Sequence, residues 1–236
     1  MTPQAAIEAL NAHSDEAEAL KMRGYHKVAR PYLGVPAPVI ETLCKEWRAA
    51  CSLDERLAVC AALWDSNSFE GRIAAAKLLT QARIRPDDTE AWALIKSWVP
   101  EFDCWAITDA VSIAGQKRLV WSPERVEDLV PWVTSEHIWT RRAALVMTLP
   151  WTKQNTPKEA ELAVRDQVLG WAAELASDHE PFIQKAIAWW LRELSKHDSP
   201  RVHNFLSQHG QKLKPFAQKE AARKLASQDY ARLFNG

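Results

Sequence analysis

The residues best suited to chemistry lie in the segment 102–109, which reads Phe-Asp-Cys-Trp-Ala-Ile-Thr-Asp. Three other segments carry an aromatic residue, a basic residue three positions later and then small and apolar residues; they begin at Phe69, Trp139 and Phe182. In the segment 102–109 the aromatic residue is Trp105, but Thr108 occupies the basic position and Asp109 follows it. Because a carboxylate appears here in place of the cation of the other segments, we predict that Asp109 is a functional residue at the centre of the site's chemistry.

Trp105 and Asp109 are four residues apart, so on a helix they share one face at a separation of one turn. One interpretation is a flat aromatic platform beside a carboxylate, lying in a groove of positive charge. The alternative is structural: Trp105 occupies an aromatic position that is often part of a core, and Asp109 caps a helix or lies on the surface. Spacing alone leaves both open.

Two pairs of adjacent residues, one of tryptophans and one of arginines, add further candidate residues for the functional site. Trp189 and Trp190 point to different faces of a helix, so one is expected to meet a groove or solvent, and Arg192 lies three residues after Trp189. Arg141 and Arg142 diverge in the same way, and a guanidinium binds phosphate through two parallel hydrogen bonds. The alternatives are tryptophans packed between helices and arginines in surface ion pairs of little energetic value.

The elements that position these residues are helices. Glycine is scarce, with 7 residues, and the sequence shows neither the alternation of a strand nor the turn residues of a tight hairpin. A serine or threonine followed by proline, as in Thr2-Pro3, marks the start of a helix. The periodicity predicts helices near 3–12, 15–29, 37–50, 54–64, 69–82, 88–98, 103–116, 123–133, 137–149, 158–176, 180–196, 199–208 and 215–227.

The aromatic positions 69, 105, 139 and 182 are 36, 34 and 43 residues apart, close to the period of a two-helix repeat. Such pairs stack into a solenoid with a concave inner surface. We therefore expect an all-α fold, an α-solenoid of HEAT-like repeats with a concave groove, and a single domain over residues 1–236. Equivalent repeats would align Arg72, Arg142 and Lys185 in a basic stripe, with Asp109 set among them.

Composition narrows the classes of function. The net charge of the 236 residues is zero, yet residues 1–136 carry 15 basic and 20 acidic residues, whereas residues 137–236 carry 15 and 10. A basic C-terminal half is compatible with a polyanion bound to one face. The four cysteines show no C-x-x-C spacing, so we expect buried thiols and no metal. With no signal-type or membrane-spanning apolar run, we expect a cytoplasmic protein.

The sequence lacks a Gly-rich phosphate loop, H-E-x-x-H, G-x-S-x-G and the glycine motif of helix-hairpin-helix repair enzymes. Nucleotide hydrolysis and serine-type acyl transfer therefore have little support.

Four motifs together resemble the AlkD family of bacterial DNA alkylation repair glycosylases, which are HEAT-like solenoids. They are Tyr25 followed by the turn 32–38 (Tyr-Leu-Gly-Val-Pro-Ala-Pro), Trp105-x-x-x-Asp109, the segment 137–144 (His-Ile-Trp-Thr-Arg-Arg-Ala-Ala) and the segment 182–193 (Phe-Ile-Gln-Lys-Ala-Ile-Ala-Trp-Trp-Leu-Arg-Glu). The resemblance runs from about residue 20 to 225 and departs at Pro36, where a polar side chain is expected. A DNA contact there is expected to be missing, and the neutral net charge is a second departure.

The resemblance implies roles for named residues. Tyr25, Trp105 and Trp189 would form an aromatic cleft against the damaged nucleotide, and Asp109 would be the catalytic carboxylate. The positions of Arg142 and Arg192 would hold the DNA backbone. The basic residues of the same two segments, Arg141 and Lys185, are further candidate DNA contacts.

The implied activity is excision of cationic N3- or N7-alkylated purines, such as 3-methyladenine and 7-methylguanine, from double-stranded DNA in base excision repair. The family does this without the base flipping that other glycosylases use. We expect a monomeric hydrolase of the bacterial cytosol or nucleoid, with no cofactor, no metal and no membrane contact. The rival interpretations are a HEAT-like module that binds DNA without cleaving it and a protein scaffold.

Overall fold

The computed structural model describes residues 1–226 and 233–234. Within these residues every regular element is helical, with thirteen α-helices joined by short 3-10 turns and no strand, which confirms the expected all-α fold. Residue 227, at the end of the predicted helix 215–227, lies outside the described residues. The chain divides into two compact units, Met1–Trp121 and Ser122–Gly236, and each is described by itself below. The expectation of a single domain stays a prediction.

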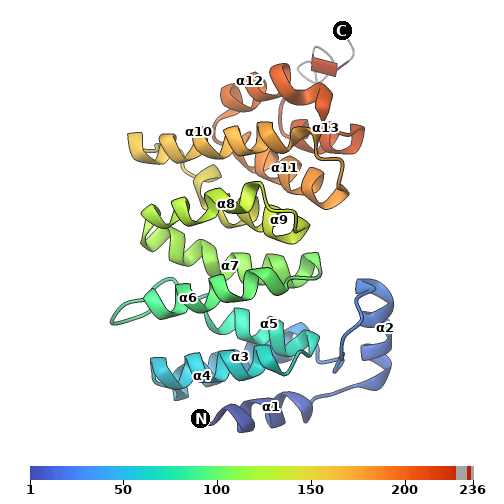
Figure 1. The fold of residues 1–236 in the computed structure, drawn as a ribbon, viewed down its shortest axis with the longest axis vertical. Helices are drawn as coiled ribbons and strands as arrows, with labels where there is room; N and C mark the ends of the chain where they lie inside the picture. Colours follow the sequence, from blue (N-terminus) through green and yellow to red (C-terminus); the bar gives the residue numbers. More distant parts are fainter. Residues whose placement is uncertain (227–232, 235–236) are drawn as a thin grey trace. The chain divides into compact units, whose positions relative to one another are not determined.

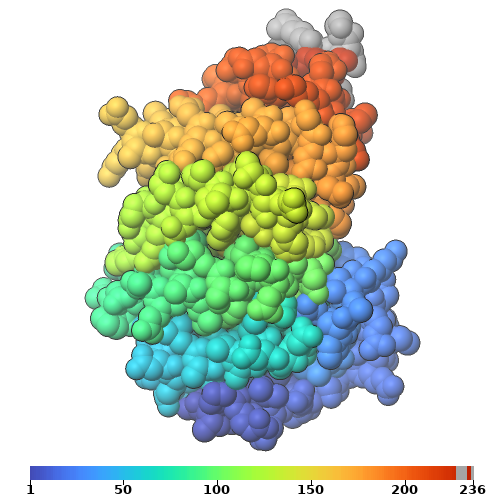
Figure 2. Space-filling view, in the orientation of Figure 1, coloured from blue at the N-terminus to red at the C-terminus, as the bar shows by residue number. Residues whose placement is uncertain are grey.

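The first unit holds seven α-helices. They are α1 (Pro3–Asn11), α2 (Glu16–His26), α3 (Ala37–Ala50), α4 (Leu53–Asp65), α5 (Phe69–Leu78), α6 (Thr89–Trp98) and α7 (Trp105–Trp121). Helix α5 is central, because it packs against α3, α4 and α7. Helix α2 lies beside the stacked helices rather than among them (Figure 1), and in the space-filling view its segment forms an edge of this unit that is open to solvent (Figure 2).

The second unit holds six α-helices. They are α8 (Val130–Val133), α9 (Ile138–Met147), α10 (Glu159–Glu174), α11 (Pro181–Leu194), α12 (Ser199–His209) and α13 (Pro215–Ala222). A 3-10 turn, Pro123–Leu129, precedes α8, and the two together occupy the predicted helix 123–133. Helix α11 is central here, because it packs against α9 and α13.

The expected repeat is visible in where the aromatic positions fall. Phe69 and Trp105 are the first residues of α5 and α7, whereas Trp139 and Phe182 are the second residues of α9 and α11. Each aromatic position therefore marks the start of a helix, as a repeat of helix pairs predicts. The structure thus has the helical repeats of an α-solenoid.

Arg72 does not contribute an exposed charge. Its side chain is packed with the guanidinium carbon 4.3 Å from the centroid of the Trp64 ring, and the residue is 6% exposed. It donates to the Glu101 carbonyl at 2.9 Å and pairs with the Glu101 carboxylate at 2.7 Å. The other face of Trp64 is also used, because this ring stacks on Trp98 with centroids 4.5 Å apart. The expectation of a basic stripe that includes Arg72 is wrong for this residue, which instead joins the helices of the core.

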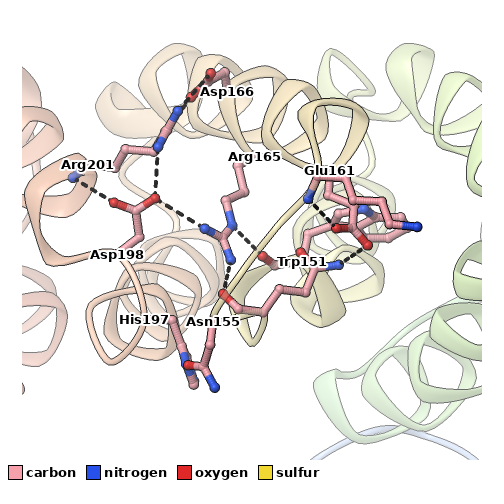
Figure 3. A network of polar contacts seen from close by, with 10 residues as sticks. Trp151, Asn155, Glu161, Arg165, Asp166, His197, Asp198 and Arg201 are labelled. Carbon is pink, nitrogen blue, oxygen red and sulfur yellow. Dashed lines mark hydrogen bonds and ion pairs between the residues drawn. The ribbon is translucent and has the colours of Figure 1, made fainter.

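In the second unit a polar network joins α10 to α12 (Figure 3). The buried Arg165 donates to the Trp151 carbonyl at 2.7 Å and to the Asp198 carboxylate at 3.2 Å. Asp198 also accepts from the Arg201 side chain at 2.9 Å, and Arg201 reaches Asp166 at 2.8 Å. Because a buried guanidinium needs paired acceptors, Asp198 fixes the position of α12 against α10.

Candidate functional site

The first unit presents Trp105 and Asp109 on one face of α7. Ile107, Thr108 and Val111 form a buried face of this helix, and the Thr108 hydroxyl donates to the Cys104 carbonyl at 2.8 Å. With that face fixed in the core, the residues at positions 105 and 109 are left half-buried, at the border of the unit. The predicted common face of Trp105 and Asp109 is therefore confirmed.

Tyr25 approaches Trp105 from α2. The two rings lie 6.2 Å apart between centroids at an angle of 80°, an edge-to-face arrangement that aromatic pairs favour. Trp105 is half-buried, but Tyr25 is 70% exposed, so the pair lies at the molecular surface. The structure thus brings together two of the residues named from the sequence, although 80 positions separate them in the chain.

The turn after α2 determines where Tyr25 lies. Helix α2 ends at His26 because Lys27 adopts a left-handed conformation with φ 58°. The chain then reaches Leu33 and Gly34, whose amides donate to the buried Glu70 carboxylate at 2.9 and 2.7 Å. Glu70 on α5 thereby holds the turn that carries α2 to the side of the stacked helices.

A second link fixes the same segment to the start of α7. The buried Arg30 donates through Nε to the Asp103 carboxylate at 3.1 Å, and its Nη2 makes a further bond to the same oxygen. Asp103 lies two residues before Trp105. The ion pair therefore sets α2 and Trp105 at a defined separation.

His26 completes this group of rings and was not foreseen from the sequence. Its ring lies 4.3 Å from Phe69 and 5.7 Å from Trp105 between centroids. Burial lowers the pKa of the His26 imidazole below its ordinary value, and the Glu70 carboxylate opposes that shift in part. The only sequence signal is its position directly after Tyr25, which spacing rules do not single out.

The second unit presents a separate cationic surface on α9, α11 and α13. A hollow of about 420 Å³ is lined by basic and aromatic side chains together with one carboxylate; the lining residues are Arg142, Lys185, Ala188, Trp189, Arg192, Phe216 and Glu220. Trp189 is half-buried whereas Trp190 is 0% exposed, so the predicted divergence of the two tryptophans is confirmed. Four of the predicted site residues thus lie around one hollow, and it can accept a flat or anionic group.

The cations of this hollow are held in place by their neighbours. Arg142 is only 5% exposed, as buried as Arg72, and it donates to the Phe182 carbonyl at 2.7 Å. The Lys185 ammonium is exposed and lies 4.9 Å from the centroid of the Phe182 ring. Arg192 pairs with Glu193 at 3.0 Å and also with Glu220. These contacts fix the orientation of the basic side chains that line the hollow, and they leave Arg192 shared between two carboxylates.

Phe216 is a second residue that was missed. It lies near the start of α13 and is 43% exposed, an unusual position for a large apolar ring. Because it lies across the hollow from a different helix, only the folded structure shows that it accompanies Trp189.

Arg141 is placed apart from the hollow. Its Nε donates to Asp178 at 2.9 Å, and its Nη1 donates to the carbonyls of Ser135 and Glu136 at 2.6 and 2.9 Å. These contacts tie the start of α9 to the segment before α11. The prediction that Arg141 contacts DNA remains a prediction, and most of its hydrogen-bonding capacity is already used.

Neither a metal site nor a membrane-spanning helix is found among the described residues. In the described part of the chain no group of three or more histidine, cysteine and carboxylate side chains is arranged to hold a metal ion. Across those same residues none of the helices combines the length and the apolar character that crossing a bilayer requires.

Comparisons with known proteins match this chain to a protein family and to solved structures. The family model described as DNA alkylation repair enzyme matches residues 6–225. A solved structure described as a predicted DNA alkylation repair enzyme from Enterococcus faecalis superposes with a TM-score of 0.77 and 24% sequence identity, covering 91% of this chain and 98% of that chain. At this identity the solved structure shows a common fold alone. A comparison with curated proteins finds no match.

Proposed function

The chain belongs to the DNA alkylation repair enzyme family, and from that premise we propose that it is a DNA glycosylase for cationic N3- and N7-alkylated purines. The observation that carries the proposal is the arrangement in the first unit, where Tyr25 meets Trp105 edge to face and Asp109 follows one helical turn later. An open aromatic contact beside a carboxylate suits a positively charged nucleotide.

The chemistry of the substrate explains why so few groups are needed. An alkylated purine that already carries a positive charge leaves as a neutral base when the bond between C1′ and N9 breaks, so no general acid is required. Positive charge then develops on the deoxyribose. A fixed carboxylate at Asp109 would stabilise that charge and orient the water that attacks C1′, leaving an abasic site.

The aromatic rings would add attraction for the same charge. A cation over the face of a tryptophan gains about 0.5–2 kcal/mol, and the gain rises as water is excluded. Tyr25 is 70% exposed, so the Tyr25–Trp105 pair would meet a nucleotide at the surface of the duplex. This exposure supports excision without rotation of the base into a deep pocket.

The hollow of the second unit supports a role in holding the strand. Arg142, Lys185 and Arg192 line it together with Trp189. Guanidinium and ammonium groups bind phosphate without reading sequence, as a repair enzyme that acts on scattered lesions requires. In this proposal the protein needs neither a metal nor a cofactor and acts on double-stranded DNA as a monomer.

The test is to incubate the protein with methylated duplex DNA and to measure the free bases. We expect release of 7-methylguanine and 3-methyladenine, and we expect Asp109→Asn to retain DNA binding while losing release. Asp65→Asn is the matched control, because Asp65 is an exposed carboxylate at the end of α4 in the same unit. Binding without release by the wild type would contradict the proposal and favour a DNA-binding module that does not cleave.

A further inference from the structure

His26 stands at the centre of the aromatic group in the first unit. Its ring lies 4.9 Å from Tyr25, 4.3 Å from Phe69, 5.7 Å from Trp105 and 6.3 Å from Tyr32 between centroids. The interplanar angle to Tyr32 is 11°, so these two rings are stacked. A single titratable ring therefore touches both Tyr25 and Trp105, the two rings that the proposed function assigns to the substrate.

The polar surroundings of His26 favour its neutral form. The buried Nδ1 atom has no hydrogen-bond partner. Glu70, the carboxylate that raises the pKa of His26, already accepts one backbone amide on each oxygen, from Leu33 and from Gly34. Burial lowers the pKa of His26 from 6.5, with Glu70 acting in the opposite direction, so the imidazole is uncharged at neutral pH.

The titratable groups shown to act on or touch this ring are Tyr25 on its own helix, Tyr32 on the following turn and Glu70 on α5. The cations Arg23 and Lys27 lie three residues before and one residue after His26, and Asp109 lies on α7, the helix that carries Trp105. On the Tyr32 side lie Cys104 and the Arg30–Asp103 ion pair, whose opposite charges offset each other. Protonation of His26 would therefore introduce a new positive charge among the rings.

We propose that His26 is a charge-selecting residue of the Tyr25–Trp105 contact: as a neutral ring it leaves the aromatic faces available to a cationic nucleotide, and as an imidazolium it opposes one. The inference rests on the proposed function and deepens it, because it assigns selectivity for charge to a residue that does not itself carry out the reaction. His26 does not touch the substrate and acts on it through the charge of its imidazolium at a distance.

The size of the effect follows from distance. A cation stacked on the outer face of Trp105 would lie about 9 Å from the His26 ring, given 5.7 Å between the two rings and about 3.5 Å for a stacked contact. Two unit charges at about 9 Å repel enough to weaken binding by roughly twofold at a dielectric constant of about 80 and by roughly twentyfold at about 20. A neutral nucleotide of the same shape would feel no such repulsion.

The experiment compares affinities for two duplexes across pH. One contains 2′-fluoro-2′-deoxy-7-methylguanosine, which is cationic and resists cleavage, and the other contains the uncharged 7-methyl-7-deazaguanine. For the wild type we expect the preference for the cationic duplex to fall between about twofold and twentyfold from pH 7.5 to pH values well below 6.5. The ratio of the two affinities cancels the effect of pH on DNA binding in general.

Variants locate the effect at His26. His26→Phe and His26→Met, two uncharged replacements of different shape, should keep a constant preference across the same range of pH. The matched control His13→Phe removes an exposed histidine from the same unit and should behave as the wild type does. By reciprocity, the cationic duplex should lower the pKa of His26, followed by NMR, more than the neutral duplex does.

The outcomes separate the two proposals. A preference that falls equally in the wild type and in both His26 variants would overturn the role of His26 alone, with release of 7-methylguanine unaffected. Equal affinity for the two duplexes at every pH, together with no release of 7-methylguanine from methylated DNA, would overturn the proposed function and this inference with it.

Discussion

Replacement of Gly34 by alanine should displace α2, the helix that carries Tyr25 and His26. Gly34 has a φ of +78°, in the left-handed region. A Cβ added there would lie 2.0 Å from the Asp15 carbonyl oxygen and 2.6 Å from the Ala19 amide nitrogen. Both are backbone atoms at the start of α2, so that helix would have to move.

The cost can be worked from the same contacts. A left-handed conformation costs a residue with a Cβ about 1–2 kcal/mol. The shift would also strain the bonds from the amides of Leu33 and Gly34 to Glu70, at 2.9 and 2.7 Å, and a hydrogen bond to a charged group contributes about 1.5–3 kcal/mol. We therefore expect Gly34→Ala to lower the free energy of unfolding by about 3 kcal/mol. For a chain of this size that corresponds to a Tm lower by about 6–12 °C.

Thermal and urea unfolding measure this loss, with Gly24→Ala as the matched control. Gly24 lies within α2, one residue before Tyr25, and an added Cβ there meets no atom within 4 Å beyond its chain neighbours and the backbone of its own helix. Alanine is favoured over glycine inside a helix by about 0.5–1 kcal/mol, so the control should be slightly more stable than the wild type. If Gly34→Ala unfolded within about 0.5 kcal/mol of the wild type, the steric argument would be refuted.

Three further predictions concern the ion network, the DNA contacts and pH. Asp198→Asn should lower the free energy of unfolding in urea by about 2–3 kcal/mol, because it leaves the buried Arg165 without its carboxylate, whereas Asp166→Asn, with a side chain 58% exposed, should cost less than about 1 kcal/mol. Arg192→Gln should weaken DNA binding and reduce the slope of log affinity against log salt by about 1; an unchanged slope would exclude Arg192 from the phosphate contacts. Burial lowers the pKa of His26 in the folded protein below 6.5. As pH falls, the unfolded chain therefore binds this proton before the folded protein does, and the stability of the fold should decline from pH 6.5 through the lower pKa of the folded state. His26→Phe should show a shallower decline in a series of thermal melts, and equal slopes would contradict the assignment.

The helices were largely readable from the sequence because their start signals are local. The Thr2 hydroxyl accepts the Ala5 amide at 3.2 Å, as the Thr2-Pro3 pair predicts. Ends were less readable: the predicted helix 15–29 stops at His26, because Lys27 takes a left-handed conformation that few non-glycine residues adopt. The predicted helix 123–133 begins instead as the 3-10 turn Pro123–Leu129.

The candidate site was readable only in part, for a physical reason. The common face of Trp105 and Asp109 follows from helical periodicity, which acts over four residues. The contact between Tyr25 and Trp105 depends on the Glu70 and Arg30 bonds that place α2, and no spacing rule reveals those. His26 and Phe216 were missed because their surroundings are built by other helices, and the burial of Arg72 under Trp64 was missed for the same reason.

In the proposed reaction the Asp109 carboxylate stabilises positive charge as a cationic purine leaves. The most direct measurement is the single-turnover rate of 7-methylguanine release from one duplex, by the wild type and by Asp109→Asn at saturating protein. We predict a rate lower by about 10²–10³-fold in the variant, the usual loss when one electrostatic contact to a transition state is removed, with an unchanged affinity for DNA. Equal rates for the two proteins would contradict the account.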